Sequence, residues 1–116
     1  MIKLPRGNTL HLTAVLTNSD GSPYIMDEKD HAVFTVKSTD DMREIPLIQK
    51  IIMPADCGEN GEIPIKLDPA DTVGIETGIY LYDLAVCIGG KDFYTAVIAS
   101  TFHVLPALGD MGGDVV

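Results

Sequence analysis

The 116-residue sequence contains no tryptophan, only seven phenylalanine and tyrosine residues, three histidines and two cysteines. Proteins that bind single-stranded nucleic acids stack the bases on exposed aromatic rings, and few rings are available here. Two cysteines without a matching pair of histidines do not form a zinc site. These shortages argue against nucleic-acid binding and against a structural metal.

Positive charge is also scarce, with 8 Lys and Arg against 17 Asp and Glu and a net charge of −9. A field of this sign repels phosphate backbones and anionic membrane surfaces. The acidic balance is typical of a solvated, soluble surface, and electrostatic docking on a basic partner protein is the alternative.

No hydrophobic run is long enough to span a bilayer. The N-terminal residues 1–6 have neither the apolar core nor the cleavage site of a secretory signal. We therefore expect synthesis in the cytosol, where Cys57 and Cys87 remain free thiols. A disulfide between them is the alternative and requires close Cβ atoms.

The longest uninterrupted stretch of β-branched and aromatic residues is 78–88, bracketed by Gly78 and the Gly89-Gly90 pair. Both of its faces are apolar, and Asp83 is its only charged residue. A strand of this kind is usually central in its sheet and covered on both faces. Gly89 to Asp92 then predicts a hairpin turn.

Five further segments have strand character because apolar residues alternate along them or turn residues bound them. They are residues 9–17, 32–37, 45–53, 62–68 and 93–105. The inward face of 45–53 stays ambiguous, because Gln49 and Lys50 each interrupt one register. Pro64 places 62–68 at a sheet edge, since proline has no N–H for a ladder.

The alternation also predicts which side chains point inward. Leu10, Leu12, Ala14 and Leu16 form the inner face of 9–17, with a threonine-rich outer face. Along 93–105, Tyr94, Ala96, Ile98, Phe102 and Val104 are predicted to share one face, interrupted only by Ser100.

Three connections carry local signals. The loop of residues 24–31 should fold its Tyr24-Ile25-Met26 segment back onto the core. Asp68 and Pro69 predict the cap and first position of a short helical turn. Ser38 and Asp41 fit a capping box loosely, so a second helical turn is possible there.

Six or seven short strands with almost no helix indicate a β-sandwich or a small barrel. We expect one domain over residues 1–105 and a flexible tail over residues 106–116, where the periodicity is lost.

The sequence contains no recognisable arrangement of catalytic residues. His11, His31 and His103 share no metal-ligand spacing with one another or with a cysteine. Asp83 has no second acid as a partner, and no nucleophile elbow or phosphate-binding loop is present. The sequence therefore predicts neither an enzyme nor a cofactor.

The structural or interface candidates are Tyr80, Tyr82 and Asp83. Tyr80 stands at the mouth of its strand, where sandwiches of the immunoglobulin type use a tyrosine to hydrogen-bond the preceding connection. A simple core or surface tyrosine is the alternative.

The order of several short segments resembles the N-terminal immunoglobulin-like domain of siphophage upper-baseplate proteins and related Firmicute-prophage tail proteins. The matching segments are Gly7–Leu10, Asp20–Pro23, Val33–Lys37, Gly61–Leu67, Asp71–Thr72, Gly78–Leu84 and Ser100–Val104. The most specific of them is Gly-x-Tyr-x-Tyr-Asp at 78–83, which follows Asp71-Thr72. The resemblance implies an immunoglobulin-like antiparallel β-sandwich of about seven strands.

The same resemblance implies a non-catalytic structural protein of a phage or prophage tail, made in the bacterial cytoplasm and then carried in the virion tail. Its expected partners are other tail or baseplate proteins and further copies of itself, with no nucleic acid and no membrane. The family's coiled-coil linker and receptor-binding module do not follow in this sequence, so we expect either a stand-alone assembly component or a module that acts on its own. A small carbohydrate- or ligand-binding β-sandwich is the alternative function.

Overall fold

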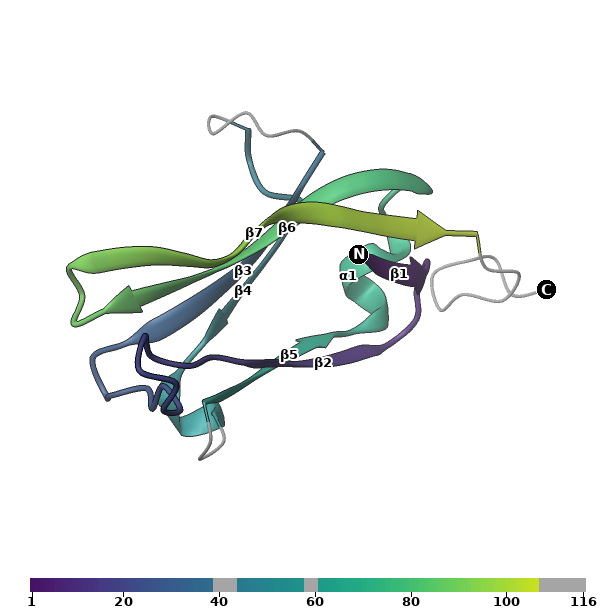
Figure 1. Cartoon of the computed structure of the whole chain (residues 1–116). Helices are drawn as coiled ribbons and strands as arrows, with labels where there is room; N and C mark the ends of the chain where they lie inside the picture. The colour runs from purple at the N-terminus through teal and green to yellow at the C-terminus, as the bar shows by residue number, and fades with distance from the viewer. Residues whose placement is uncertain (39–43, 58–60, 107–116) are drawn as a thin grey trace.

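The structure, a computed structural model, describes residues 1–38, 44–57 and 61–106. Within these residues it contains seven strands, one short α-helix and one turn of 3-10 helix (Figure 1). The strands are β1 (Ile2–Pro5), β2 (Leu10–Val15), β3 (His31–Lys37), β4 (Ile48–Ile52), β5 (Glu62–Leu67), β6 (Gly78–Ile88) and β7 (Asp92–Leu105). The helical segments are η1 (Pro54–Asp56) and α1 (Pro69–Val73). The all-β prediction is therefore confirmed.

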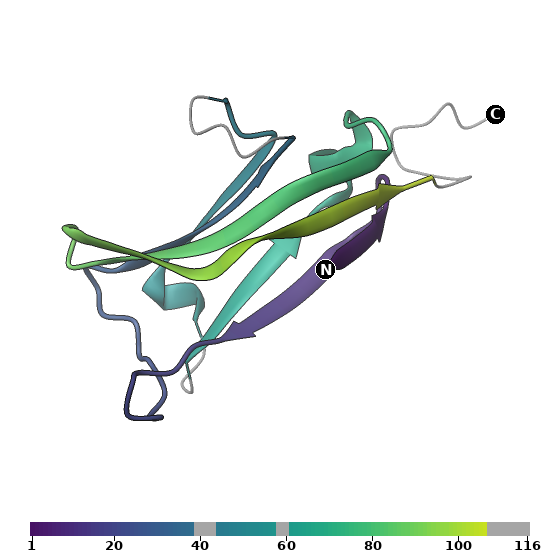
Figure 2. The ribbon, with the colours of Figure 1, turned by 45° about the horizontal axis from the view of Figure 1, so that its top comes forward.

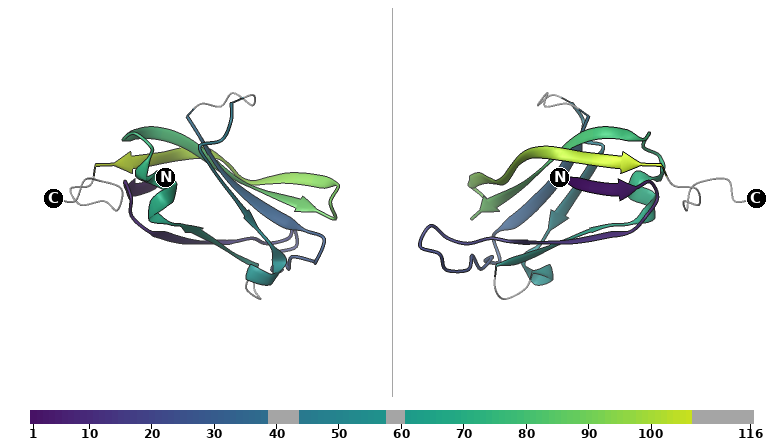
Figure 3. Two further views of the ribbon diagram at one scale, coloured as in Figure 1. Left: turned by 180° about the vertical axis from the view of Figure 1, so that it is seen from behind. Right: turned by 45° about the vertical axis from the view of Figure 1, so that its right-hand side comes forward.

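The strands form two sheets. The larger has five strands in the order β1-β7-β6-β3-β4, and the smaller consists of β2 and β5. The larger sheet is mixed, because β1 runs parallel to β7 whereas its other pairs are antiparallel. It is twisted along its length, and β2 and β5 pack against one of its faces (Figures 2 and 3).

The core lies between the two sheets and is built from alternate residues of their strands. In β3 and β5 the alternation is complete, as the sequence predicts. The buried residues are Ala32, Phe34 and Val36 on β3 and Ile63, Ile65 and Leu67 on β5. Because each strand has period two, one register alone buries all of these side chains.

The smaller sheet also agrees with the predicted pattern. Leu10, Leu12 and Ala14 of β2 pack against the core, and the threonine-rich face is exposed. β5 pairs with β2 on one side only, and Pro64 lies opposite Thr13. The position of Pro64 in an edge strand is confirmed.

The structure resolves the inward face of β4, which the sequence left open. Ile48 and Ile52 are buried, which places Lys50 on the inward face between them. Its ammonium lies 2.9 Å from a carboxylate oxygen of Asp71 in α1. Lys50 therefore reaches the rim of the core with its charge paired, and Gln49 points outward.

The helix α1 begins as predicted, with Asp68 before it and Pro69 at its first position. The carboxylate of Asp71 accepts a 2.6 Å hydrogen bond from the Asp68 backbone N–H. The hydroxyl of Thr72, which is fully buried, accepts a 2.8 Å hydrogen bond from the N–H of Gly7. The helix therefore anchors the turn between β1 and β2.

β6 is the middle strand of the larger sheet, as predicted from its composition. The prediction that both of its faces are covered is wrong for the described residues. The face that includes Leu84 and Val86 is buried against the smaller sheet, but Ile79 on the other face is 65% exposed. No described strand or helix packs over that outer face (Figure 2).

The β6–β7 hairpin is confirmed, and Gly89 and Gly90 both have positive φ angles in its turn. The prediction that one face of β7 contains Ile98 together with Phe102 and Val104 is wrong, because Ile98 is 78% exposed whereas the other two are buried. Two register shifts flank Leu84, where β7 contains extra residues relative to β6. They bring Val97 opposite Leu84 and against the core, while Phe102 and Val104 remain inward.

β1 was not predicted. It is four residues long, ends in a proline and pairs in parallel with the last four residues of β7. Ile2 and Leu4 are buried. Such a short segment has too few alternations to be identified as a strand from sequence.

Two predictions concern residues outside this description. The possible helical turn near Ser38 and Asp41 falls on residues 39–43, and only Pro106 of the expected flexible tail is described. The prediction for the loop of 24–31 is confirmed in part: Tyr24 and Met26 pack against the core, but Ile25 is exposed and His31 already belongs to β3.

Candidate functional site

The candidate site is the outer face of the larger sheet. Strand alternation directs the side chains between the buried ones to this side. They include large apolar groups that are open to solvent, among them Ile51 of β4, Ile79 of β6 and Phe93 of β7, with exposed fractions of 61%, 65% and 63%. This uncovered apolar character makes the outer face the candidate site.

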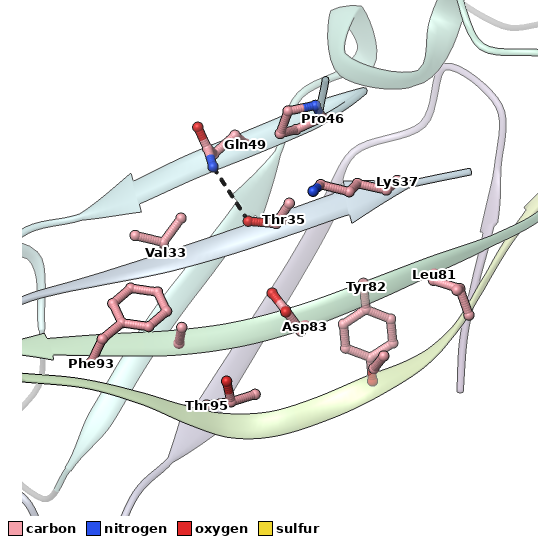
Figure 4. Close-up of a pocket in the computed structure, with 12 residues that line it drawn as sticks. Val33, Thr35, Lys37, Pro46, Gln49, Leu81, Tyr82, Asp83, Phe93 and Thr95 are labelled. Atoms are coloured by element: carbon pink, nitrogen blue, oxygen red, sulfur yellow. Dashed lines mark hydrogen bonds between the residues drawn. The ribbon is translucent and has the colours of Figure 1, made fainter. Parts of the chain in front are cut away.

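A shallow hollow of about 500 Å³ lies on this face and crosses four strands (Figure 4). Its walls combine aliphatic, aromatic and short polar side chains. They include Val33, Thr35, Gln49, Asp83, Phe93 and Thr95. The Gln49 side-chain amide donates a 3.5 Å hydrogen bond to the Thr35 hydroxyl across β3 and β4.

Irregular pairing of β7 lies beside the hollow. Tyr82 pairs with Ser100 and Leu84 with Val97, so no β7 residue stands directly opposite Asp83. Such bulges bend a strand and re-aim its side chains. Here Ile98 turns outward and Ala99 lines the hollow next to Asp83.

Asp83 is half-buried among the lining side chains. Burial raises the pKa of its carboxyl group, and the neighbouring Lys37 ammonium offsets part of that effect. The fold therefore disfavours the ionised carboxylate relative to water. A cationic or N–H donor group from a partner would stabilise it.

The three sequence-derived candidates come together only in part, because Tyr82 and Asp83 both line the hollow whereas Tyr80 does not (Figure 4). Asp83 points to the outer face, but Tyr80 and Tyr82 belong to the inner face. The Tyr82 ring packs between Phe34 and Phe102, with ring centroids 5.7 and 6.4 Å away. Tyr82 is therefore mainly a core residue.

Tyr80 makes the contact that its position suggests. Its hydroxyl donates a hydrogen bond to the backbone carbonyl of Glu76, four residues upstream. This bond fixes the connection between α1 and β6. The bond therefore supports the fold at this connection.

Sequence reasoning missed Asp30, a carboxylate that is only 4% exposed. Its oxygens accept hydrogen bonds from the Tyr24 hydroxyl at 2.7 Å, the Asp27 N–H at 2.9 Å and the Gly89 N–H at 2.8 Å. Burial alone would raise the pKa of Asp30, but these bonds together with nearby His31 outweigh it and lower that pKa. No local signal could identify Asp30, because Gly89 is 59 residues away in sequence.

The remaining titratable candidates lie apart. His11 is exposed on β2, His31 begins β3, and His103 lies on β7. Among the described residues, no group of three or more His, Cys, Asp or Glu side chains could hold a metal ion. Cys57 and Cys87 are free thiols, and burial raises the pKa of Cys57.

No helix in the described ranges has both the length and the apolar character needed to cross a lipid bilayer. Comparisons with protein-family models, with curated proteins and with solved structures found no match to this chain.

Proposed function

We propose that this chain is a non-catalytic structural protein of a phage or prophage tail, acting as a baseplate-associated assembly or adaptor domain. The observation that carries the proposal is the outer face of the larger sheet, whose apolar side chains no described element covers. The assignment to a phage tail rests on the order of short motifs from Gly7 to Val104, which resembles that of siphophage baseplate proteins. Assembly would begin in the bacterial cytoplasm and end in the virion tail.

We further infer that the two sheets form an immunoglobulin-like sandwich. The strand order supports this, because such sandwiches pair a GFC-type sheet with a second sheet that contains strands B and E. Here β7, β6 and β3 occupy the first positions and β2 and β5 the second. The hydrogen bond from Tyr80 to Glu76 is a second feature of that fold.

The hollow indicates the chemistry of the partner. Its aliphatic and aromatic walls fit apolar side chains, and Asp83 fits a basic group placed among them. A tail protein with an apolar patch around an arginine or lysine meets both requirements. The net charge of −9 favours the same kind of partner.

The test is mass spectrometry of purified tailed particles from the strain that carries the gene, with and without a charge placed on the outer face. Wild-type protein should be found in the particles. Phe93→Glu should be lost from them, whereas Ile25→Glu, at a similarly exposed residue in another region, should be retained. Particles that lack the wild-type protein, or that retain both variants equally, would contradict the proposal.

A carbohydrate-binding module is the second candidate. The observation in its favour is that Phe93 is exposed beside Thr35, Gln49 and Asp83, which offers a ring and several hydrogen-bonding groups in one hollow. A glycan array tests it, and binding that Phe93→Ala abolishes would support it. A blank array would leave protein docking as the function of this face.

A further inference from the structure

The free edge of β2 is the second surface that the described residues leave open. β2 pairs with β5 on one side and with no described strand on the other. Hollows of about 170 and 750 Å³ separate it from β7. Leu10, Leu12 and Ala14 are consequently only half-buried, while the inward residues of β5 are fully buried.

The backbone groups on this edge can be assigned. The N–H of Leu16 donates a 2.9 Å hydrogen bond to the carbonyl of Gly61 and therefore points toward β5. Because antiparallel strands alternate, the even-numbered residues of β2 bond to β5 and the odd-numbered residues face away. Pro64 agrees, since it has no N–H to offer the opposite residue, Thr13. His11, Thr13 and Val15 therefore present N–H and C=O groups to solvent.

The edge carries none of the usual devices that prevent strand addition. Sheet edges are normally protected by lysine, proline or inward charges. β5 contains Pro64, β1 contains Lys3 and Pro5, and β4 contains the inward Lys50. β2 contains no proline, no lysine and no acidic residue over Leu10–Val15.

The sequence around this edge is also symmetric in chemical character about Thr13. In three of the four pairs at equal distances from Thr13 the residues are similar in type: Leu12 with Ala14, Leu10 with Leu16, and Thr9 with Thr17. The fourth pair, His11 with Val15, differs in type but brings no two like charges together. Two copies aligned antiparallel about Thr13 would place apolar residues opposite apolar residues on the inner face and no charge opposite a like charge.

We propose that β2 pairs antiparallel with β2 of a second copy, with the two Thr13 residues opposite each other. The odd-numbered residues then form hydrogen-bonded pairs, each exchanging two backbone hydrogen bonds, and the two small sheets join as β5-β2-β2-β5. This inference extends the proposed role in assembly by naming a partner and an edge. It uses a different surface from the outer face around Asp83.

Disulfide cross-linking tests the register, in a background where Cys57 and Cys87 are replaced by serine. Hydrogen-bonded antiparallel neighbours have Cα atoms about 5.5 Å apart, within the range of a disulfide. Thr13→Cys should form covalent dimers with itself on mild oxidation. His11→Cys and Val15→Cys should cross-link when mixed and form little dimer alone. Lys66→Cys, exposed on neighbouring β5, is the matched control and should form few dimers.

Sedimentation equilibrium from about 1 to about 500 µM gives an independent measurement. Thr13→Lys should weaken the dimer by at least about tenfold, because two ammonium groups meet at the symmetry axis. The same change at exposed Thr77 should leave the dimer intact. A strict monomer, or a dimer that cross-links no better through residue 13 than through residue 66, would overturn the inference. Either result would leave the incorporation of the protein into tail particles unaffected, so failure of the two proposals is distinguishable.

Discussion

At the scale of single residues, Asp30 illustrates how a buried carboxylate joins distant parts of a chain. Its two oxygens connect the loop of 24–30 with the turn of the β6–β7 hairpin. A buried charge is tolerated when several donors replace its hydration. These three donors explain why the carboxylate of Asp30 can be nearly inaccessible to solvent.

Asp30→Asn should lower the free energy of unfolding by about 1–3 kcal/mol, because an amide nitrogen must replace one of the accepting oxygens. Urea denaturation measures the change. Glu28→Gln in the same loop is the control and should stay within about 0.5 kcal/mol, since Glu28 is exposed.

The loss of stability caused by Asp30→Asn should depend on pH. The pKa of Asp30 is lower in the folded state than its ordinary value of 3.8, so the ionised side chain stabilises the fold above that pH. The stabilisation is lost as the pH falls through the lower folded-state pKa. The difference between the wild type and Asp30→Asn should therefore shrink below about pH 4. A difference that is constant across this range would argue against an ionised Asp30.

Tyr80→Phe tests the other residue-scale contact. Removing the hydroxyl deletes one hydrogen bond to Glu76 and should cost about 0.5–1.5 kcal/mol. Tyr94→Phe, at a tyrosine that is 57% exposed, should change the stability by less than about 0.5 kcal/mol. Equal effects in thermal or urea unfolding would show that the Tyr80 hydroxyl contributes nothing specific.

At the scale of elements, glycines at strand ends determine whether the strands can meet. Gly61 and Gly21 both have positive φ angles, +75° and +88°, but their surroundings differ. A Cβ on Gly61 would collide with the backbone carbonyl of Leu16, whereas nothing lies within 4 Å of one on Gly21. A side chain is therefore tolerated less well at Gly61, where β2 and β5 meet, than at Gly21.

Gly61→Ala should be more destabilising than Gly21→Ala. Gly21→Ala should cost about 1 kcal/mol from backbone strain alone. Gly61→Ala adds a steric clash with backbone that cannot move aside, and we expect a total of about 3 kcal/mol or more. Parallel urea titrations compare the two, and similar losses would contradict the close approach at Leu16.

The bulges of β7 provide a second comparison at this scale. Truncating Val97, which packs against the core, to alanine should cost about 1–2 kcal/mol. Ile98→Ala should cost less than about 0.5 kcal/mol, although isoleucine is the larger side chain, because Ile98 is exposed. A larger loss of stability for Ile98→Ala than for Val97→Ala would mean that Ile98 points inward, as strict alternation along β7 requires, and would exclude the bulges.

At the scale of the whole molecule, charge and edge geometry act in opposite directions. Each copy carries a net charge of −9, so two copies repel each other at long range. The β2 edge itself contains no acidic residue. Dimer formation should therefore be limited by the long-range repulsion between the two net charges and not by repulsion between residues at the β2 edge.

Raising sodium chloride from about 20 mM to about 500 mM should strengthen the dimer, because salt screens the repulsion without weakening backbone hydrogen bonds. Sedimentation equilibrium at the two salt concentrations measures this. A dimer that weakens with salt would indicate an interface held by ion pairs and would exclude the β2 edge.

The sequence by itself determined the all-β class, the positions of six strands, the inward faces of β2, β3 and β5, the cap of α1 and the glycine turn of the hairpin. These features depend on residues close together in the chain, where period two and turn chemistry are sufficient. Tertiary structure alone decided the parallel pairing of β1, the inversion at Ile98, the burial of Asp30 and the open edge of β2. The first three depend on partners many residues away, whose placement no local pattern contains, and the edge of β2 is open because no described strand pairs with it there.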